Sequence, residues 1–170
     1  MKPNPKTGEF LLPGGTILSA RLTRSAFLAS AEGARAQVSV KNEPWCSFRF
    51  EDDEDPLNII VFFNGEKLET VQVSLRDPKF GTGWENWSEE KELDRKRAND
   101  QWLREHGLAP EKKYAWGSVW SGYDARSGSS MIVIRYEHGS YPSRARDERP
   151  RAFPRRKASV TSSIFVVKKL

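Results

Sequence analysis

The densest group of residues that could bind a metal ion or exchange protons is the acidic run from Glu51 to Asp55. Carboxylate oxygens are the ligands that hard cations such as Ca²⁺ prefer. A calcium-binding EF-hand loop, however, alternates its ligands with other residues, needs a glycine at its turn and ends on a ligating glutamate, and this run lacks that pattern. A run of like charges between two strands is typical of a solvated loop. The sequence therefore predicts no metal site and no cofactor.

A second candidate is the glycine-containing segment from Phe80 to Trp84, which precedes a predicted helix. Glycines at a helix N-terminus can cradle a phosphate group. The lysine and Ser/Thr of a phosphate-binding loop are absent here. Glu85, Glu89 and Glu90 would also place negative charge where the anion should lie. The pattern favours an entry loop to the helix over a phosphate site.

Nucleophilic catalysis would need a histidine beside Cys46, a serine or an aspartate. The only histidines are His106 and His138, and no catalytic signature surrounds either. Each is interpreted as a structural or surface histidine, and Cys46 as a small buried side chain. One alternative is an enzyme that uses His138, Glu51 or Asp124 next to an aromatic surface. That alternative requires these three side chains to meet in one cleft.

Six tryptophans, at positions 45, 84, 87, 102, 116 and 120, give the chain a large aromatic surface. Exposed tryptophans anchor protein interfaces and stack on bases or sugars. The competing interpretation is that they fill the space between a helix and a sheet, because large aromatic side chains dominate small cores. Trp84 and Trp87 lie in a predicted loop, so we expect them to be the most exposed. The candidate partner-binding residues are Trp84, Trp87, Glu89, Glu90, Trp116 and Trp120.

The net charge of +5 is unevenly distributed along the 170 residues. Residues 139–170 carry nine basic and two acidic side chains, a net +7, whereas residues 1–138 carry 19 basic and 21 acidic ones, a net −2. Arginine and lysine neutralise phosphates, so a basic arm can bind nucleic acid without reading its bases. An incidental disordered extension is the competing interpretation. The candidate nucleic-acid-binding residues are Arg144, Arg146, Arg149, Arg151, Arg155, Arg156 and Lys157.

The elements that must position these groups are mostly strands. Leu57–Phe63, the dipeptide Asn64-Gly65 and an alternating stretch over 70–75 predict a β-hairpin with a type I′ turn. The alternation over 114–123 and 131–136 predicts a second hairpin. Further strands are expected over 16–22, 37–41 and 45–50.

Two helices are predicted. Ser88, followed by glutamates and closed by Gly107, indicates a long helix over about 88–106. Its apolar contacts are expected from Leu93, Ala98, Trp102 and Leu103, and its Glu92–Lys96 and Asp100–Arg104 spacings favour ion pairs.

Thr23 indicates the start of a short helix over about 24–32, which Gly33 would end. Because strands outnumber helices and the connections are short, the predicted fold is α+β. It consists of an antiparallel sheet of about six strands with one long surface helix and one short helix.

The length suits one domain. Residues 1–15 are predicted to be a leader loop, residues 16–138 the α+β domain, and residues 139–170 a basic, Pro/Arg-rich arm. The apolar run Phe10–Leu12 is too short for a signal peptide, and Ile59–Phe63 is too short to span a membrane. We therefore expect a cytoplasmic protein with no membrane partner, which also suits a single cysteine.

Several segments together resemble small uncharacterised bacterial proteins, some of them similar in size and style to immunity proteins that neutralise toxins. These segments are Asn42–Cys46, Trp84, Trp87–Leu93, Trp116-Gly117, Tyr123-Asp124 and Gly128–Ser130. The resemblance covers about residues 17–137 and excludes the arm. It implies the domain limits and a bacterial origin, and it implies no activity.

The leading hypothesis is a non-enzymatic protein-interaction module of inhibitor or immunity type. An acidic, tryptophan-rich body without an assembled catalytic set can dock basic partners. The expected partner is another protein. The alternatives are nucleic-acid binding through the basic arm and an uncharacterised enzyme.

Overall fold

The computed structural model describes residues 1–51, 56–81 and 83–138. The chain divides into two units, residues 1–139 and 140–170, and all strands and helices described belong to the first. The predicted basic arm and most of the acidic run Glu51–Asp55 lie outside the described residues. Within the described ranges, no helix is long and apolar enough to cross a membrane.

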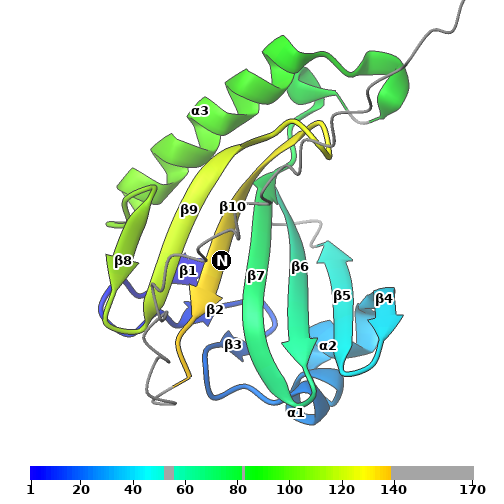
Figure 1. Ribbon diagram of the computed structural model, residues 1–170, viewed down its shortest axis with the longest axis vertical. Coiled ribbons are helices and arrows are strands. Elements are labelled where there is room, and N and C mark those ends of the chain that lie inside the picture. The colour runs from blue at the N-terminus through cyan, green and yellow to red at the C-terminus, as the bar shows by residue number, and fades with distance from the viewer. Residues whose placement is uncertain (52–55, 82, 139–170) are drawn as a thin grey trace, which may run out of the picture. The chain divides into compact units, whose positions relative to one another are not determined.

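A seven-stranded antiparallel sheet forms the centre of the fold (Figure 1). Its strands lie in the order β4-β5-β6-β7-β10-β9-β8. Strands β7 and β10 pair in the middle of the sheet, although the long helix and two strands lie between them in the chain. The prediction of an antiparallel α+β fold is confirmed. The strands are β4 (Gln37–Asn42), β5 (Trp45–Glu51), β6 (Leu57–Asn64), β7 (Lys67–Leu75), β8 (Lys112–Tyr114), β9 (Gly117–Asp124) and β10 (Ser129–Tyr136).

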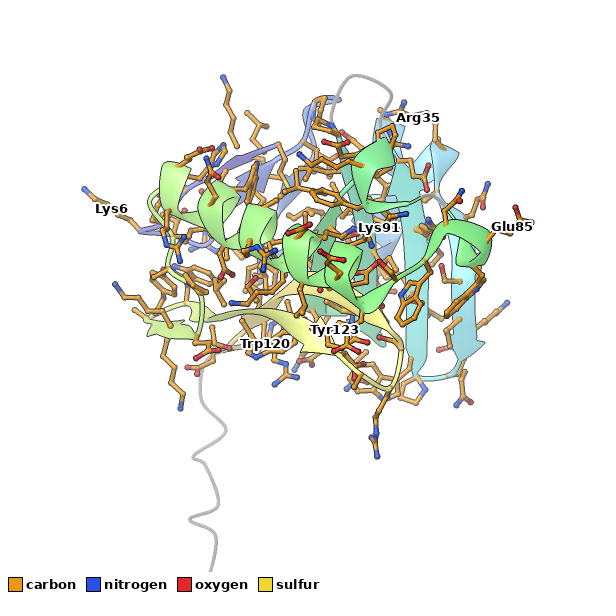
Figure 2. The ribbon with its side chains drawn as sticks, turned by 90° about the horizontal axis from the view of Figure 1, so that it is seen from above. Lys6, Arg35, Glu85, Lys91, Trp120 and Tyr123 are labelled. Atoms are coloured by element: carbon orange, nitrogen blue, oxygen red, sulfur yellow. The ribbon has the colours of Figure 1, made fainter. Side chains whose placement is uncertain are left out.

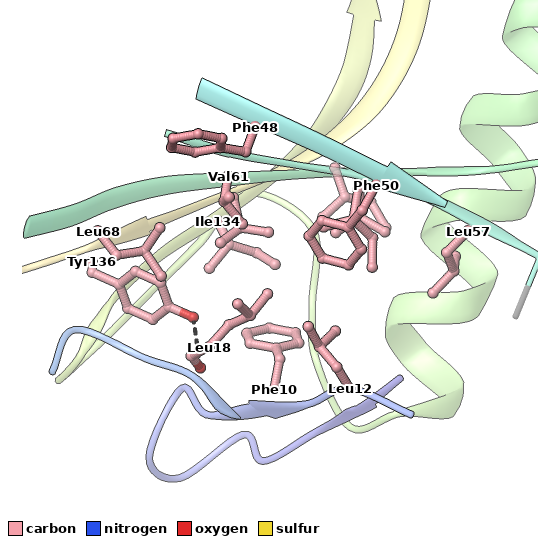
Figure 3. Packing of buried hydrophobic residues seen from close by; sticks show 14 of the residues in the cluster. Phe10, Leu12, Leu18, Phe48, Phe50, Leu57, Val61, Leu68, Ile134 and Tyr136 are labelled. Atoms are coloured by element: carbon pink, nitrogen blue, oxygen red, sulfur yellow. Dashed lines mark hydrogen bonds between the residues drawn. The ribbon is translucent and has the colours of Figure 1, made fainter. Parts of the chain in front are cut away.

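Residues 1–15 are part of the folded unit and contribute two short strands, which differs from the expected leader loop. A small sheet is formed by β1 (Lys2–Pro3), β2 (Phe10–Leu11) and β3 (Ile17–Leu18). Phe10 and Leu12 are only 0% and 2% exposed, because they pack into the main core (Figure 3). The hydroxyl of Tyr136 donates a hydrogen bond to the carbonyl of Leu18 at 3.2 Å, which ties this sheet to the end of β10.

The predicted short helix is two helices, α1 (Arg24–Leu28) and α2 (Ala31–Arg35). Thr23 caps the first, as predicted, and accepts a hydrogen bond from the backbone N–H of Ala26. The Ser30 hydroxyl accepts from the N–H of Gly33 and so starts a second helix. Gly33 lies inside α2, where a Cβ atom would come within 1.9 Å of the Phe27 carbonyl oxygen. The helix pair is therefore packed too closely for any other residue there.

The long helix α3 (Glu89–Glu105) has the predicted start and end. The Ser88 hydroxyl accepts a hydrogen bond from the backbone N–H of Lys91 at 3.2 Å. Gly107 follows the helix with a φ of 73°, a left-handed conformation that glycine adopts without strain.

Replacing Ser88 with alanine is expected to lower the free energy of unfolding by about 1 kcal/mol, because the N-terminal N–H groups of α3 lose their acceptor. Urea denaturation followed by circular dichroism measures this loss. Ser88→Asp restores an acceptor and should remain close to the wild type. Equal losses in the two variants would contradict the capping role.

The inner face of α3 is more polar than its sequence predicts. Its buried residues are Glu92, Asn99, Asp100 and Leu103, whereas Leu93 is 39% exposed. The Asn99 side-chain oxygen accepts a hydrogen bond from the N–H of Leu75 at 3.3 Å. The helix is therefore fixed to β7 and β10 by polar contacts, and it also packs against β9.

Both predicted hairpins form, with corrections at their turns. In β6–β7 the turn residues are Gly65 and Glu66, since Asn64 already pairs with Lys67. Only Gly65 has a positive φ, at 59°, which fits a type II′ turn better than the predicted type I′.

The strand expected over 114–123 is interrupted at Ala115 and Trp116. Tyr114 pairs with Gly117, so the chain reverses there and β8 and β9 are separate antiparallel neighbours. Strand β9 then pairs with β10 along its whole length, from Gly117 to Asp124.

The two faces of the large sheet differ. Along β6 the buried residues alternate with half-buried ones, so one face is in the core. Phe27 of α1, Leu18 of β3 and Glu92 of α3 all contact residues on that face. In the described part of the chain, no helix covers the opposite face.

Candidate functional site

A groove of about 890 Å³ lies at the end of the sheet where β5, β7 and β9 finish. Strand residues that point away from the core form one part of it: Arg49 and Glu51 of β5, Asn58 of β6 and Ser74 of β7. The β9–β10 turn contributes a second part through residues 127–129, and the segment before α3 contributes the third.

The third part contains Trp84 and Trp87, the tryptophans expected from the sequence to be most exposed. Two short 3₁₀ helices, Pro78–Phe80 and Trp84–Asn86, lead into α3. Trp84 is 81% exposed and Trp87 is 40% exposed, and their ring centroids are 6.4 Å apart. We call residues 83–90 the tryptophan segment. It includes Glu89 and Glu90, which are also exposed, so four of the six partner-binding candidates lie together.

The tryptophan segment is held to its surroundings at Asn86 and Trp87. The indole N–H of Trp87 donates to the carbonyl of Gly128 in the β9–β10 turn at 2.7 Å. The Lys91 ammonium group donates to the carbonyl of Asn86, also at 2.7 Å. A loop that is held in place before binding loses less conformational entropy when a partner binds.

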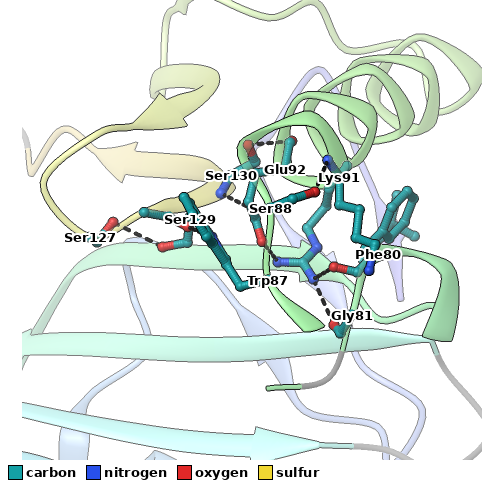
Figure 4. Close-up of polar contacts among 12 residues, drawn as sticks. Phe80, Gly81, Trp87, Ser88, Lys91, Glu92, Ser127, Ser129 and Ser130 are labelled. Atoms are coloured by element: carbon teal, nitrogen blue, oxygen red, sulfur yellow. Dashed lines mark hydrogen bonds and ion pairs between the residues drawn. The ribbon is translucent and has the colours of Figure 1, made fainter. Parts of the chain in front are cut away.

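Glu92 and Arg95 line the groove and belong to one network of polar contacts, in which Figure 4 labels Glu92. The Arg95 guanidinium donates to the carbonyls of Phe80 at 3.4 Å and Gly81 at 3.2 Å, and it lies 2.6 Å from Glu92 Oε1. The other oxygen of Glu92 accepts from the backbone N–H of Ser130 at 2.7 Å. The Ser130 hydroxyl in turn donates to the carbonyl of Glu92 at 2.6 Å. This network joins α3, β10 and the segment that leads to Trp84.

Charges on the strand side of the groove are paired with one another. Glu51 bridges Arg49 at 2.9 Å and Arg76 at 2.7 Å. The Arg49 Nε–H also donates to Asn58 Oδ1 at 3.0 Å. Because these pairs are solvent-exposed, they contribute little to stability and mainly fix side-chain positions. The strand side therefore offers a patch of mixed charge.

The rim near the start of α3 is negative. Burial, and then the charges of Glu89, Glu92 and Asp124, raise the pKa of Tyr123 above its ordinary value. The backbone N–H of Arg126 and the Ser127 hydroxyl lower the pKa of Asp124, which therefore stays ionised at neutral pH. Burial is the largest cause of the rise at Tyr123, and the nearby carboxylates add to it.

The remaining two tryptophan candidates lie elsewhere. Trp116 stacks on Tyr114 with centroids 4.9 Å apart, and its indole N–H donates to the carbonyl of Pro5 at 3.0 Å. It is half-buried and holds the N-terminal segment at the opposite end of β9 from the groove. Trp120 is 39% exposed on the uncovered sheet face, where its ring lies over Gly122 (Figure 2).

The residues of the enzyme alternative do not meet in one cleft. Glu51 pairs with Arg76 just beyond the end of β7, whereas the His138 imidazole contacts the carbonyl of Leu68 at 2.8 Å near the start of β7. Asp124 lies at the end of β9, opposite Ser129. Among the described residues, no group of three or more His, Cys, Asp or Glu side chains could hold a metal ion.

Cys46 is buried, as predicted, at 5% exposure. Its sulfur accepts a hydrogen bond from Arg24 at 3.2 Å, and Glu43 pairs with the same guanidinium at 3.0 Å. The candidate nucleic-acid-binding residues of the arm, Arg144, Arg146, Arg149, Arg151, Arg155, Arg156 and Lys157, lie outside the described residues.

The roles of Glu92 and Arg95 in the groove were not predicted from the sequence. The expected ion-pair partner of Glu92 was Lys96, but Glu92 binds Arg95 and Lys96 binds Asp100 at 2.7 Å. The spacing of Glu92 and Arg95 is an equally good helical ion-pair spacing. The Glu92–Arg95 pair is favoured over the Glu92–Lys96 pair because Arg95 also donates to the carbonyls of Phe80 and Gly81.

No protein-family model matches the sequence, and no curated protein shows significant similarity to it. The fold is similar to that of a chain in a solved structure described as Rhs1-CT in complex with cognate immunity protein RhsI1. The TM-score is 0.55, at 12% sequence identity, over 84% of this chain and 91% of that one. At this identity the similarity establishes a shared fold.

Proposed function

We propose that this chain is a protein-binding module of inhibitor or immunity type, which docks on its partner through the groove and the tryptophan segment. The observation that carries the proposal is the high exposure of Trp84 and Trp87 on a segment anchored at Gly128 and on α3. Tryptophan is one of the residue types enriched among the few residues that contribute most of the binding energy in protein interfaces. An 81% exposed tryptophan gains nothing from the core, so stability does not account for it.

The fold comparison supports the same role. The similar chain belongs to a complex that contains an immunity protein and its cognate partner. A protein that inhibits another by docking needs a surface and no catalytic groups, and the residues of the enzyme alternative do not converge here. The inhibitor role is therefore the simplest one that uses the groove and the exposed tryptophans together.

The proposal predicts that binding depends on Trp84. Full-length protein is used to capture partners from a lysate of the source organism, and the captured protein is purified for affinity measurements. The Trp84→Ala variant should bind the captured protein about 30-fold more weakly, because a central interface tryptophan contributes roughly 2 kcal/mol. The thermal stability of this variant should stay at the wild-type value, since the Trp84 side chain is exposed.

Trp45→Ala is the matched control. Trp45 is 46% exposed, and it lies opposite Asn64 at the other end of β5 from the groove. This variant should bind as the wild type does. The captured protein should also arrest growth when expressed alone and lose that effect when this chain is co-expressed. Loss of binding in Trp45→Ala but not in Trp84→Ala, or no neutralisation, would contradict the proposal.

A further inference from the structure

Trp84, whose nearest ring is that of Trp87, lies in a segment that is rich in exposed carboxylates. The tryptophan segment contains Glu85, Glu89 and Glu90 and no basic residue. All three carboxylates are exposed, and Figure 2 shows Glu85 directed away from the body of the protein. Glutamates in the first turn of α3 also favour the helix dipole, yet at the surface their charges remain available to a ligand.

The cations nearest to this segment in the chain are already engaged. The Lys91 ammonium binds the Asn86 carbonyl, Arg95 binds Glu92, and Lys79 binds Asp77 at 2.9 Å. Among the described residues, no cation forms an ion pair with Glu85, Glu89 or Glu90. Glu89 lies near Tyr123, where its charge adds to the effect of burial in raising the pKa of that side chain.

We propose that Trp84 and the three carboxylates receive an arginine side chain of the partner. A guanidinium group stacks flat on an indole ring and is more weakly hydrated than an ammonium group, so it loses less on leaving water. Its N–H groups can also donate to carboxylates of the same segment. This inference rests on the proposed function and names the chemistry that the docking surface recognises. It also explains why the most exposed aromatic ring lies in an acidic segment.

The test uses short peptides as probes. Full-length protein is titrated with oligoarginine, oligolysine and oligoglutamate peptides of equal length, and binding is followed by calorimetry and by the indole N–H signals of the tryptophans. Oligoarginine should bind most tightly and shift the Trp84 signal. Oligoglutamate can bind the basic residues 139–170, but it should not shift the Trp84 signal.

Variants separate stacking from simple charge attraction. Trp84→Ala should weaken oligoarginine binding about 2- to 5-fold, the effect of one cation–π contact at an exposed site. Trp84→Phe retains a ring and should recover part of that loss. Combined Glu85→Gln, Glu89→Gln and Glu90→Gln substitutions should weaken binding further and reduce its dependence on salt. Trp45→Ala should behave as the wild type.

Equal oligoarginine affinity for the wild type and Trp84→Ala would overturn the inference. So would equal affinities for oligoarginine and oligolysine, since that result indicates charge attraction alone. Either result leaves the proposed function intact if the captured partner still depends on Trp84. Failure of partner capture with normal oligoarginine binding would instead count against the proposed function alone.

Discussion

Replacing Glu92 with glutamine is expected to lower the free energy of unfolding by about 3 kcal/mol. The Glu92 side chain is almost fully buried and binds the Arg95 guanidinium and the N–H of Ser130 at once. An amide keeps the shape but removes the charge. It also turns an NH₂ group toward one of two donors, so either Arg95 Nη1 or the Ser130 N–H loses its acceptor. Urea denaturation measures the loss.

Glu90→Gln is the control, because Glu90 is an exposed glutamate in the same first turn of α3. It should cost less than about 1 kcal/mol, the usual contribution of an exposed charge near a helix end. The Glu92→Gln/Arg95→Met double variant should lose less than the sum of the single losses, by about 1–3 kcal/mol, because the two side chains form one network. Additive losses, or similar losses in Glu92→Gln and Glu90→Gln, would contradict this role.

The second large effect is expected at Phe27. This side chain is fully buried, and its ring centroid lies 5.8, 5.9 and 5.7 Å from those of Phe48, Phe50 and Phe63. Truncation to alanine should lower the free energy of unfolding by about 3–5 kcal/mol, because it removes a large buried group and leaves a cavity between α1 and the sheet. Thermal and urea denaturation both report this change.

Leu28, the next residue of α1, is a matched control because it is 45% exposed. Leu28→Ala should change the free energy of unfolding by less than about 0.5 kcal/mol, the usual range for surface substitutions. Phe27→Leu should recover a large part of the loss, since it refills much of the cavity. A small loss in Phe27→Ala would mean that the aromatic cluster does not hold α1 on the sheet.

The supporting network and the docking surface are joined through Arg95. Its contacts to the carbonyls of Phe80 and Gly81 fix the chain just before the tryptophan segment. The ion pair of Arg95 with Glu92 is largely buried. A buried ion pair contributes little net folding energy, and for the function we propose its use is to position the chain that leads to the tryptophans.

Local features of the fold were predictable from the sequence. The N-caps Thr23 and Ser88, the limits of α3 and the glycine-containing hairpin between β6 and β7 depend on residues within a few positions of one another. Their conformations are set by local hydrogen bonds and by which residues tolerate a positive φ. The alternation of apolar residues along β6 and β7 likewise marks one buried face.

The roles of the tryptophans were only partly predictable. Trp84 and Trp87 lie in the short connecting segment before α3, so their exposure follows from the absence of a long strand or helix that would bury them. Trp116 was expected in a strand, but its burial was not predictable, because its partner Pro5 is far away in the chain. Its burial depends on the N-terminal segment, which folds onto the sheet instead of forming a leader loop.

By itself, the sequence determined the fold class, the main hairpins, the long helix and the exposure of two tryptophans. Only the tertiary structure decided that β7 pairs with β10, that α3 buries Glu92 and Asn99, and that Trp87 binds the β9–β10 turn. Each of these contacts joins segments that are distant in the chain. Hydrophobic burial brings such segments together but does not select which polar groups pair. The pairing is decided in the folded chain, where buried hydrogen-bond donors and acceptors must find partners.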